Sequence, residues 1–424
     1  MNVAQRLGNR KGLRVTLLDK NNHHLFQPLL YQVAMAALSP AEIAVPIRTV
    51  LAKYKNIDVR MAEVREVDLE ARRLRTDRGE VDYDYLVLAC GARHGYFGHN
   101  EWERFAPGLK RIEQALEIRK RVLTAFEMAE QIGDREEQRQ YLTFVVVGGG
   151  ATGVELAGAL GEMSRYTLSR EFRQIDPART RVILIEGGSR ILPAFDKSLS
   201  EAAARELEKK GVAVWTNSLV TGIDEDGVHV GDEMIRTKTV LWAAGVETSS
   251  LNKQLGASLD RAGRVRVMSD LSLEGHAEVF VIGDQACCEQ DGVALPGIAP
   301  VAIQQGQYLG KLLRDEIAGG ERRPFHYFDK GVMATIGRAH AIVQMRSLRF
   351  SGFFAWLVWL FIHILYLIGF KNRVLVFIQW AWSYFTFRRG ARLITSHEWR
   401  DFPVVSAPPG AGSDASDAAP PKEA

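Results

Sequence analysis

The sequence predicts an α/β fold in which parallel sheets are covered by helices. Short apolar runs alternate along the chain with longer helix-forming segments, which is the pattern of strands and helices in such folds. A glycine cluster joins one strand directly to a helix at residues 144–158, and several other strands end in an acidic residue or a glycine. The length of 424 residues indicates two or three domains.

The expected elements follow one another in chain order. Residues 1–15 are typical of an amphipathic helix that runs into a strand, and they contain no cleavable signal peptide. Strands are predicted at the apolar runs 13–19, 83–90, 144–147, 181–186, 212–216, 239–245 and 277–284. Helices are predicted over 113–131, with charges along one face, and over 200–210.

The glycine cluster after the strand 144–147 is the most informative motif. Gly148, Gly150 and Gly153 fit the pattern G-x-G-x-x-G between a strand and a helix. The first glycine permits a tight turn, the second lets a pyrophosphate approach the backbone, and the third lets the helix pack on the strand. The motif predicts a bound dinucleotide; the alternative is a glycine-rich turn without a ligand.

The acidic residue that ends the next strand indicates which dinucleotide is bound. Glu186 closes the run 181–186, where a carboxylate would bind a ribose diol and repel a 2′-phosphate. NADH is therefore favoured over NADPH. The distance along the chain from the glycines to Glu186 exceeds the usual ~20 residues, and an insertion at 164–180 would account for the difference.

Composition excludes several other classes of protein. A formal net charge of +3 gives no indication of a nucleic-acid partner. Three cysteines, Cys90, Cys287 and Cys288, are too few for an iron–sulfur cluster and suggest no disulfide framework. His23 and His24 are adjacent and lack a cluster of further ligands, so no metal site is expected.

Two apolar stretches near the C-terminus indicate contact with a membrane. Residues 350–370 carry no formal charge, and a helix of that length would be ~31 Å long, enough to span a bilayer. Lys371 and Arg373 separate this stretch from a shorter one at 374–387. There Gln379, Ser383 and Thr386 form a polar stripe, which is typical of a helix that lies in the interface. Interfacial docking is preferred over a single span and over a buried hairpin.

In their order along the chain, the motifs resemble those of the type II NADH:quinone oxidoreductases, which are single-subunit NADH dehydrogenases that pump no protons. The similar segments are 21–34, 86–99, 148–158, 184–195, 241–246, 279–286, 296–308, 334–339 and 367–373. The resemblance implies two Rossmann-like domains of the pyridine nucleotide-disulfide oxidoreductase type and a C-terminal membrane-docking domain. The expected limits are 1–110 and 266–330 for FAD binding, 111–265 for NADH binding, 331–402 for the membrane domain and 403–424 for a disordered tail.

The resemblance also assigns roles to individual residues around FAD. Asp19 corresponds to the acid on the adenosine ribose, Val64 to a backbone contact with adenine, and Asp284 to the carboxylate on the ribityl chain. The remaining cofactor positions are Gly91, Gly245, Ala302 and Ile303, of which the last two line the isoalloxazine.

Three further positions are expected at the reacting end of the site. Gln304 and Gln305 correspond to the quinone end. Glu155 matches a glutamate that lies between nicotinamide and flavin, and it is the expected catalytic residue. Taken by its spacing alone, Glu155 is also explained as a first-turn glutamate that the helix dipole favours.

Some positions depart from the family pattern. The first strand and the first G-x-G-x-x-G, which hold the FAD pyrophosphate in the family, have no counterpart before the helix at Met1. We expect the natural start to lie upstream of Met1; with Met1 as the start, FAD would bind weakly. Pro300 stands where many members have glutamine beside the quinone, and Cys90 is expected to be a buried packing residue.

The expected activity is FAD-dependent oxidation of NADH with reduction of a membrane quinone. The expected location is the bilayer surface at the cytoplasmic face of the inner membrane, and the sequence is compatible with a homodimer. A sulfide:quinone reductase is an alternative, although it needs a suitable cysteine pair. A flavin-poor NADH-binding sensor or scaffold is another, supported only by the missing first glycine motif.

Overall fold

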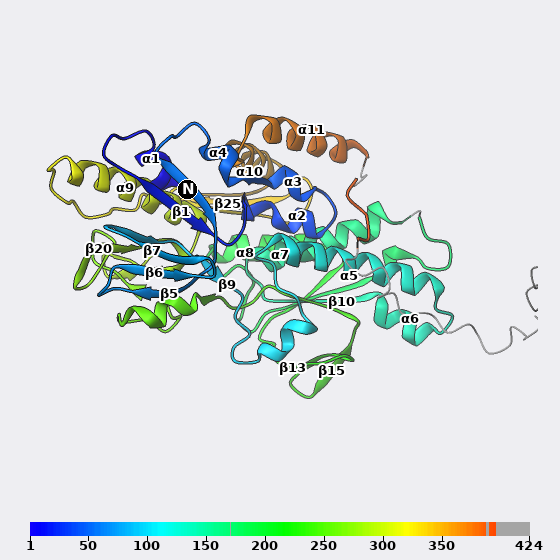
Figure 1. Ribbon diagram of the computed structural model, residues 1–424. Coiled ribbons are helices and arrows are strands. Elements are labelled where there is room, and N and C mark those ends of the chain that lie inside the picture. The colour runs from blue at the N-terminus through cyan, green and yellow to red at the C-terminus, as the bar shows by residue number, and fades with distance from the viewer. Residues whose placement is uncertain (170, 387–389, 396–424) are drawn as a thin grey trace, which may run out of the picture.

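The computed structural model describes residues 1–169, 171–386 and 390–395 (Figure 1). Two α/β regions lie side by side, and the C-terminal residues add an antiparallel sheet and two helices. The predicted tail at 403–424 falls outside the described residues.

The second α/β region contains a four-stranded parallel sheet in the order β12-β11-β10-β16. Its strands are β10 (Thr143–Val147), β11 (Arg181–Ile185), β12 (Val212–Trp215) and β16 (Thr239–Trp242). Every residue of β10 is buried, because helices or loops cover both faces of a parallel sheet. The four strands predicted at 144–147, 181–186, 212–216 and 239–245 are therefore confirmed.

Four helices and a small antiparallel sheet flank these strands. The helices are α5 (Ile112–Gln131), α6 (Arg135–Tyr141), α7 (Ala151–Glu162) and α8 (Lys197–Lys209). The small sheet comprises β13 (Val220–Ile223), β14 (Gly227–Val230) and β15 (Glu233–Arg236). Helix α8 begins before the predicted residue 200 because Asp196 caps it by accepting a hydrogen bond from the Ser198 N–H at 3.0 Å.

The described residues of the first α/β region contain three separate parallel strand pairings, of which the shortest joins residues 265–266 to residues 286–287. Strand β1 (Val15–Asp19) pairs with β4 (Ile57–Met61), and β8 (Leu86–Leu88) pairs with β20 (His276–Val281). Within the described residues, β1 and β8 each pair with a parallel strand on one edge only. The segments between these strands form α2 (Leu30–Ala34), α3 (Pro40–Ile43), α4 (Ile47–Leu51), β2 (His23–Leu25), β3 (Ala44–Pro46) and the antiparallel β5 (Val64–Asp68), β6 (Arg73–Thr76) and β7 (Gly79–Asp82).

The predicted N-terminal helix is confirmed as α1 (Asn2–Leu7), and it packs closely on α9 (Ala299–Ile317). Gly306 and Gly310 of α9 allow this approach. A Cβ atom on Gly310 would lie 2.7 Å from the Cβ of Arg6, and one on Gly306 would lie 3.0 Å from the Cβ of Asn2. The N-terminal helix is thus fixed against the helix that the sequence assigns to the flavin and quinone.

The C-terminal region opens with the antiparallel strands β24 (Val332–Thr335), β25 (Ala341–Met345) and β26 (Leu348–Gly352). Two helices follow, α10 (Phe353–Tyr366) and α11 (Phe370–Thr386). In Figure 1 they lie along one side of the molecule, next to α3 and α4.

The structure corrects the predicted limits of the two apolar stretches. Residues 350–370 do not form one helix, because Leu367 is extended and Gly369 has a φ of +88°. Lys371 and Arg373 do not interrupt the second stretch but lie in the first turn of α11, where Arg373 Nε donates to the Leu367 carbonyl at 2.7 Å. Among the described residues, no helix is both long enough and apolar enough to cross a membrane.

Candidate active site

The glycine loop between β10 and α7 has the geometry of a phosphate-binding turn. Gly148 has a φ of +109°, and a Cβ there would lie 2.8 Å from the backbone of Ala243. A Cβ on Gly153 would lie 1.8 Å from the Gly148 oxygen, so the helix can approach the strand only with glycine at this position. At Gly150 an added Cβ would meet nothing within 4 Å. The second glycine therefore faces open space at the N-terminus of α7, where a pyrophosphate can accept N–H bonds.

Glu186 lies directly beside this loop. Its carboxylate accepts hydrogen bonds from the Gly149 N–H and the Gly188 N–H, both at 2.6 Å. The predicted insertion at 164–180 is ordered in its described residues, since Glu130 of α5 accepts N–H bonds from Arg173 and Gln174. The insertion thus separates the glycines and Glu186 along the chain while the fold keeps them in contact.

Glu155 stands in the second turn of α7, on the same helix as the glycine motif. Burial raises the pKa of its carboxyl group to about 8, and a hydrogen bond with the Thr335 backbone acts in the opposite direction. The carboxyl group is therefore largely protonated at neutral pH, as a proton donor beside a hydride-transfer site would be.

Three predicted FAD residues follow the ends of parallel strands. Asp19 ends β1, Gly91 follows β8, and Asp284 follows β20. Ligands of α/β proteins bind outside the carboxyl ends of such strands. Lys110 Nζ lies 4.0 Å from the Asp284 carboxylate, so a cation from the linker between the two regions reaches this edge. The sequence did not indicate Lys110 as a site residue, because Lys110 lies in an irregular segment.

Chain neighbours of the two residues predicted at the adenosine end line one hollow in the surface. They are Lys20 and Asn21, which follow Asp19, and Ala62 and Glu63, which precede Val64. Asp19 and Val64 are not among its lining residues, but the Ala62 N–H donates to the Asp19 carbonyl at 3.0 Å, which holds the two chain segments together.

Helix α9 carries the residues predicted at the flavin and quinone. Ala302 lies in the first turn of α9, and Ile303 follows it. A Cβ atom added to Gly283 would lie 3.6 Å from the Cβ of Ala302, so the start of α9 is close to the turn after β20. Pro300 occupies the start of the helix, where a missing N–H costs nothing.

The two predicted quinone residues make bonds within the protein. Gln304 exchanges two 2.9 Å hydrogen bonds with the backbone of Phe328. Gln305 is buried, and its side-chain oxygen accepts the Gly283 N–H at 2.7 Å. Gln305 therefore holds the turn that carries Asp284.

Gly245 lies in the second linker between the two regions. Its φ is +65°, and a Cβ there would lie 2.5 Å from the Gly95 oxygen. Trp242 donates its indole N–H to the same oxygen at 3.1 Å and stacks on Tyr96 with ring centroids 5.0 Å apart. This aromatic contact joins the two regions, and the sequence motifs did not indicate it.

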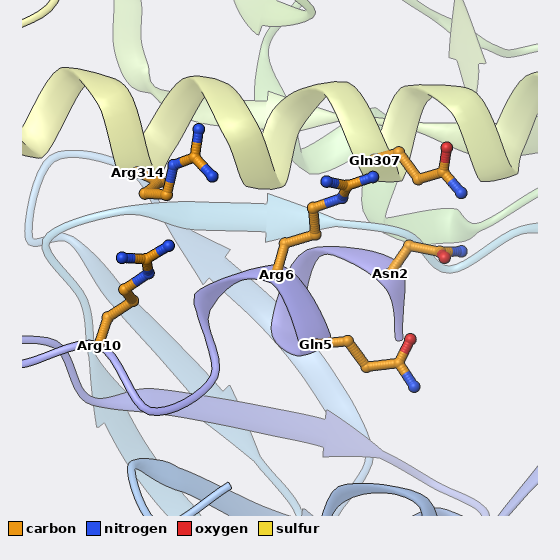
Figure 2. Close-up of a pocket in the computed structure, with 6 residues that line it drawn as sticks. All are labelled: Asn2, Gln5, Arg6, Arg10, Gln307 and Arg314. Atoms are coloured by element: carbon orange, nitrogen blue, oxygen red, sulfur yellow. The ribbon is translucent and has the colours of Figure 1, made fainter.

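A second hollow lies between α1 and α9 and is lined by no predicted site residue. Figure 2 shows three arginines around it, Arg6, Arg10 and Arg314, together with Asn2, Gln5 and Gln307. Arg314 is paired with Asp315 at 2.7 Å, which offsets part of the positive charge.

The cysteines are placed partly as expected. Cys287 and Cys288 are buried, and burial raises the pKa of the Cys288 thiol to about 11. Cys90 is exposed, so its predicted burial is wrong. Cys90 follows β8, whose free edge leaves that loop uncovered. No group of three or more His, Cys, Asp or Glu residues able to hold a metal occurs in the described part of the chain.

Comparison with known proteins identifies first the class and then the family. Residues 1–306 match the pyridine nucleotide-disulphide oxidoreductase family, which defines the class of both α/β regions. Residues 330–389 match the NDH2 C-terminal domain. A type II NADH:quinone oxidoreductase of Mycobacterium tuberculosis is 42% identical over 94% of this chain and 88% of its own length. A type II NADH:quinone oxidoreductase of Staphylococcus haemolyticus is 30% identical over 76% of this chain and 80% of its own length. The chain belongs to the type II NADH:quinone oxidoreductase family.

Solved structures agree in fold. NDH2 from Plasmodium falciparum, determined in complex with NADH, has a TM-score of 0.83 at 20% identity and covers 93% of this chain and 97% of its own. The sulfide:quinone oxidoreductase of Aquifex aeolicus has a TM-score of 0.71 at 17% identity, and it covers 88% of this chain and 89% of its own. The predicted fold class and family are therefore confirmed.

Proposed function

We propose that the protein oxidises NADH and passes two electrons to a membrane quinone through bound FAD, without pumping protons. The observation that carries the proposal is the arrangement on α7. One helix begins at an open glycine loop and presents a protonated Glu155 one turn further on. In the proposed reaction, α7 would hold the phosphates of a dinucleotide at its N-terminus and a proton donor in its second turn.

The NADH side of the reaction uses residues of the second α/β region. Gly148, Gly150 and Gly153 bind the pyrophosphate, and Glu186 accepts hydrogen bonds from the ribose diol. A 2′-phosphate would meet the Glu186 carboxylate, so NADH is preferred to NADPH. Glu155 orients the nicotinamide and donates or holds a proton beside it.

The first α/β region offers contacts for FAD. Asp19 and Val64 would contact the adenosine and Asp284 the ribityl chain, and Gly91, Gly245, Ala302 and Ile303 would contact the rest of the cofactor. These residues would contact the nucleoside, ribityl and ring parts of the cofactor. When bound, FAD accepts the hydride and passes electrons on singly or in pairs.

The membrane side is supported by the outward faces of α10 and α11. Phe354, Phe370 and Phe385 are 75%, 81% and 81% exposed, and Trp382 is 61% exposed. The predicted polar stripe, Gln379, Ser383 and Thr386, is half-buried instead.

Polar atoms of α11 are turned toward the body of the protein. Gln379 donates to Glu42, and the indole N–H of Trp380 donates to Gln32 at 2.7 Å. A contiguous exposed apolar surface of this kind is typical of membrane docking. We propose monotopic attachment at the cytoplasmic face of the inner membrane, with quinone reaching the start of α9 from the lipid.

We also propose the domain limits predicted above. The FAD-binding domain comprises residues 1–110 and 266–330, the NADH-binding domain residues 111–265, and the membrane domain residues 331–402. The homodimer stays a prediction that light scattering of the purified protein would test.

The two other functions are less well supported. A sulfide:quinone reductase needs paired redox cysteines, but Cys90 is exposed while Cys287 and Cys288 are adjacent and buried. A flavin-poor sensor would need no protonated carboxyl group beside the nicotinamide.

The test is flavin content together with NADH-dependent quinone reduction in membranes that contain the full-length protein. We expect near-stoichiometric FAD and a rate that depends on quinone. Absence of both would favour the sensor or scaffold.

A further inference from the structure

The β24–β25 turn lies along one face of the NADH-binding helix α7. Three positions of α7 meet it in succession, each about one turn from the last. Glu155 bonds the backbone of Thr335, and a Cβ on Gly158 would lie 3.2 Å from Ile336. Glu162 accepts the Arg338 N–H at 2.5 Å. The C-terminal region is therefore fixed to the face of α7 that carries the catalytic candidate.

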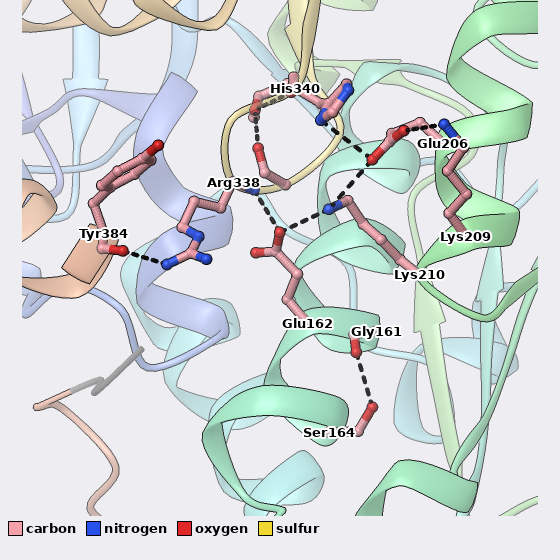
Figure 3. A network of polar contacts seen from close by, with 11 residues as sticks. Gly161, Glu162, Ser164, Glu206, Lys209, Lys210, Arg338, His340 and Tyr384 are labelled. Carbon is pink, nitrogen blue, oxygen red and sulfur yellow. Dashed lines mark hydrogen bonds and ion pairs between the residues drawn. The ribbon is translucent and has the colours of Figure 1, made fainter. Parts of the chain in front are cut away.

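A nearly buried group of charges fixes the far end of this contact. Lys210 Nζ lies 2.9 Å from Glu162 Oε1 and 3.7 Å from Glu206 Oε1, with side-chain exposures of only 10–12%. His340 Nδ1 lies 3.3 Å from the same Glu206 oxygen (Figure 3). Buried ion pairs contribute little net stability, but they hold a defined geometry, because a misplaced partner leaves a charge unpaired.

The Arg338 side chain extends the contact to the membrane helices. Its guanidinium donates to the carbonyl of Tyr384 and lies 5.1 Å from the centre of the Tyr384 ring. Tyr384 belongs to the last turn of α11, where helix carbonyls lack partners within the helix and a cation is favourable. Tyr384 also stacks on Trp356 of α10, with centroids 5.4 Å apart. One residue thus binds the NADH helix through its backbone and the membrane hairpin through its side chain.

We propose that Arg338 is a positioning residue that sets α11 in register with α7, so that a quinone arriving from the lipid meets the flavin at the correct place. The proposal rests on the proposed function. It predicts that Arg338 acts on the quinone half of the reaction and not on the NADH half, since its backbone bond to Glu162 does not depend on its side chain.

The test compares Arg338→Gln with the control Arg349→Gln. Arg349 also joins the C-terminal sheet to the NADH region, through Asp196 at 2.7 Å. Among the described residues, its side chain makes no hydrogen bond or ion pair with α11. The full-length proteins are assayed with NADH in phosphatidylcholine and phosphatidylglycerol vesicles that carry a long-chain quinone, and separately with water-soluble ferricyanide.

We expect Arg338→Gln to raise the KM for quinone about tenfold, since small displacements far from the chemistry have effects of this order. The KM for NADH and the ferricyanide rate should stay within about twofold. Arg338→Lys should recover part of the loss, because lysine keeps the charge but not the planar stacking. An unchanged quinone KM, or equal losses with both acceptors, would overturn the proposal.

Hydrogen exchange gives a readout that does not require activity. In Arg338→Gln, exchange should rise in residues 370–386 and stay unchanged in 151–162; no difference from wild type in 370–386 would also overturn the proposal. If wild-type protein reduces no quinone in vesicles, the proposed function fails, and hydrogen exchange still decides the role of Arg338.

Discussion

At the scale of single residues, we propose that the carboxyl group of Glu155 takes part in the chemistry. We expect Glu155→Gln to lower turnover by about 10²-fold, the usual range for loss of a general acid, while FAD stays bound. Because the pKa of Glu155 is raised to about 8, the wild-type rate should fall as the pH rises through 8. Rates at saturating NADH and quinone measure this, and an unchanged rate in the variant would remove Glu155 from the mechanism.

The pH dependence of thermal stability gives a second measurement on Glu155→Gln that does not require activity. The pKa of Glu155 is higher in the folded protein than its ordinary value of 4.5, so the folded state holds a proton more tightly than the unfolded state. The contribution of the neutral carboxyl group is fully present below pH 4.5 and is lost as the pH rises through about 8. Relative to Glu155→Gln, the wild-type protein should lose thermal stability across that window.

Two glycines of the loop should respond differently to the same added methyl group. In Gly150→Ala the Cβ meets no protein atom within 4 Å, so the fold should survive while the KM for NADH rises at least about tenfold. In Gly148→Ala the Cβ meets Ala243 at 2.8 Å with φ at +109°, so folding itself should suffer. Melting temperatures and NADH kinetics separate the two effects. A normal NADH KM in Gly150→Ala would argue against a pyrophosphate at this loop.

The sequence predicted residues whose role is local, and missed those whose partners are distant. The glycine motif and Glu186 follow from a strand, a turn and a helix that are adjacent in the chain. The bond between Gln304 and Phe328 and the approach of Lys110 to Asp284 depend on tertiary packing. Cys90 was misplaced for the same reason, because its exposure depends on which strand covers β8.

At the scale of elements, the C-terminal helices present their apolar side outward. Burying one large aromatic side chain contributes roughly 1.5–3 kcal/mol. We therefore expect Trp382→Ser with Phe385→Ser to weaken binding to lipid vesicles at least about tenfold. NADH oxidation by ferricyanide should persist, since neither residue contacts α7. Vesicle flotation measures the binding.

Leu219 provides the matched control for that experiment. It is 71% exposed on the NADH region, distant in the sequence from α10 and α11. Leu219→Ser should leave vesicle binding unchanged. Equal binding by the double variant and the wild-type protein would contradict a docking role for α11.

The apolar composition of the C-terminal stretches predicted helices α10 and α11, but it did not predict the residues at which they begin and end. Hydropathy alone reads 350–370 as one segment, yet a left-handed Gly369 and an extended Leu367 divide it. Lys371 and Arg373 look like an interruption in the sequence. Arg373 stands in the first turn of α11, where its side chain donates back to the carbonyl of Leu367.

At the scale of the whole molecule, the strands of the NADH region could be predicted, but their order in the sheet and the assembly of the regions could not. Parallel strands that alternate with helices define a Rossmann-like sheet. The contact of the β24–β25 turn with α7 joins Ile336 to the same hydrophobic core as Val154, and no local pattern encodes such a contact. Among the described residues, β1 and β8 each have one parallel partner strand.

The central claim is that one flavin receives electrons from NADH bound at α7 and gives them to a quinone from the membrane. Anaerobic absorption spectroscopy of the purified full-length protein in quinone-free vesicles tests it most directly. The account predicts that stoichiometric NADH abolishes the visible flavin absorption and that added quinone restores it. A flavin spectrum that NADH leaves unchanged, or that quinone fails to restore, would contradict the account.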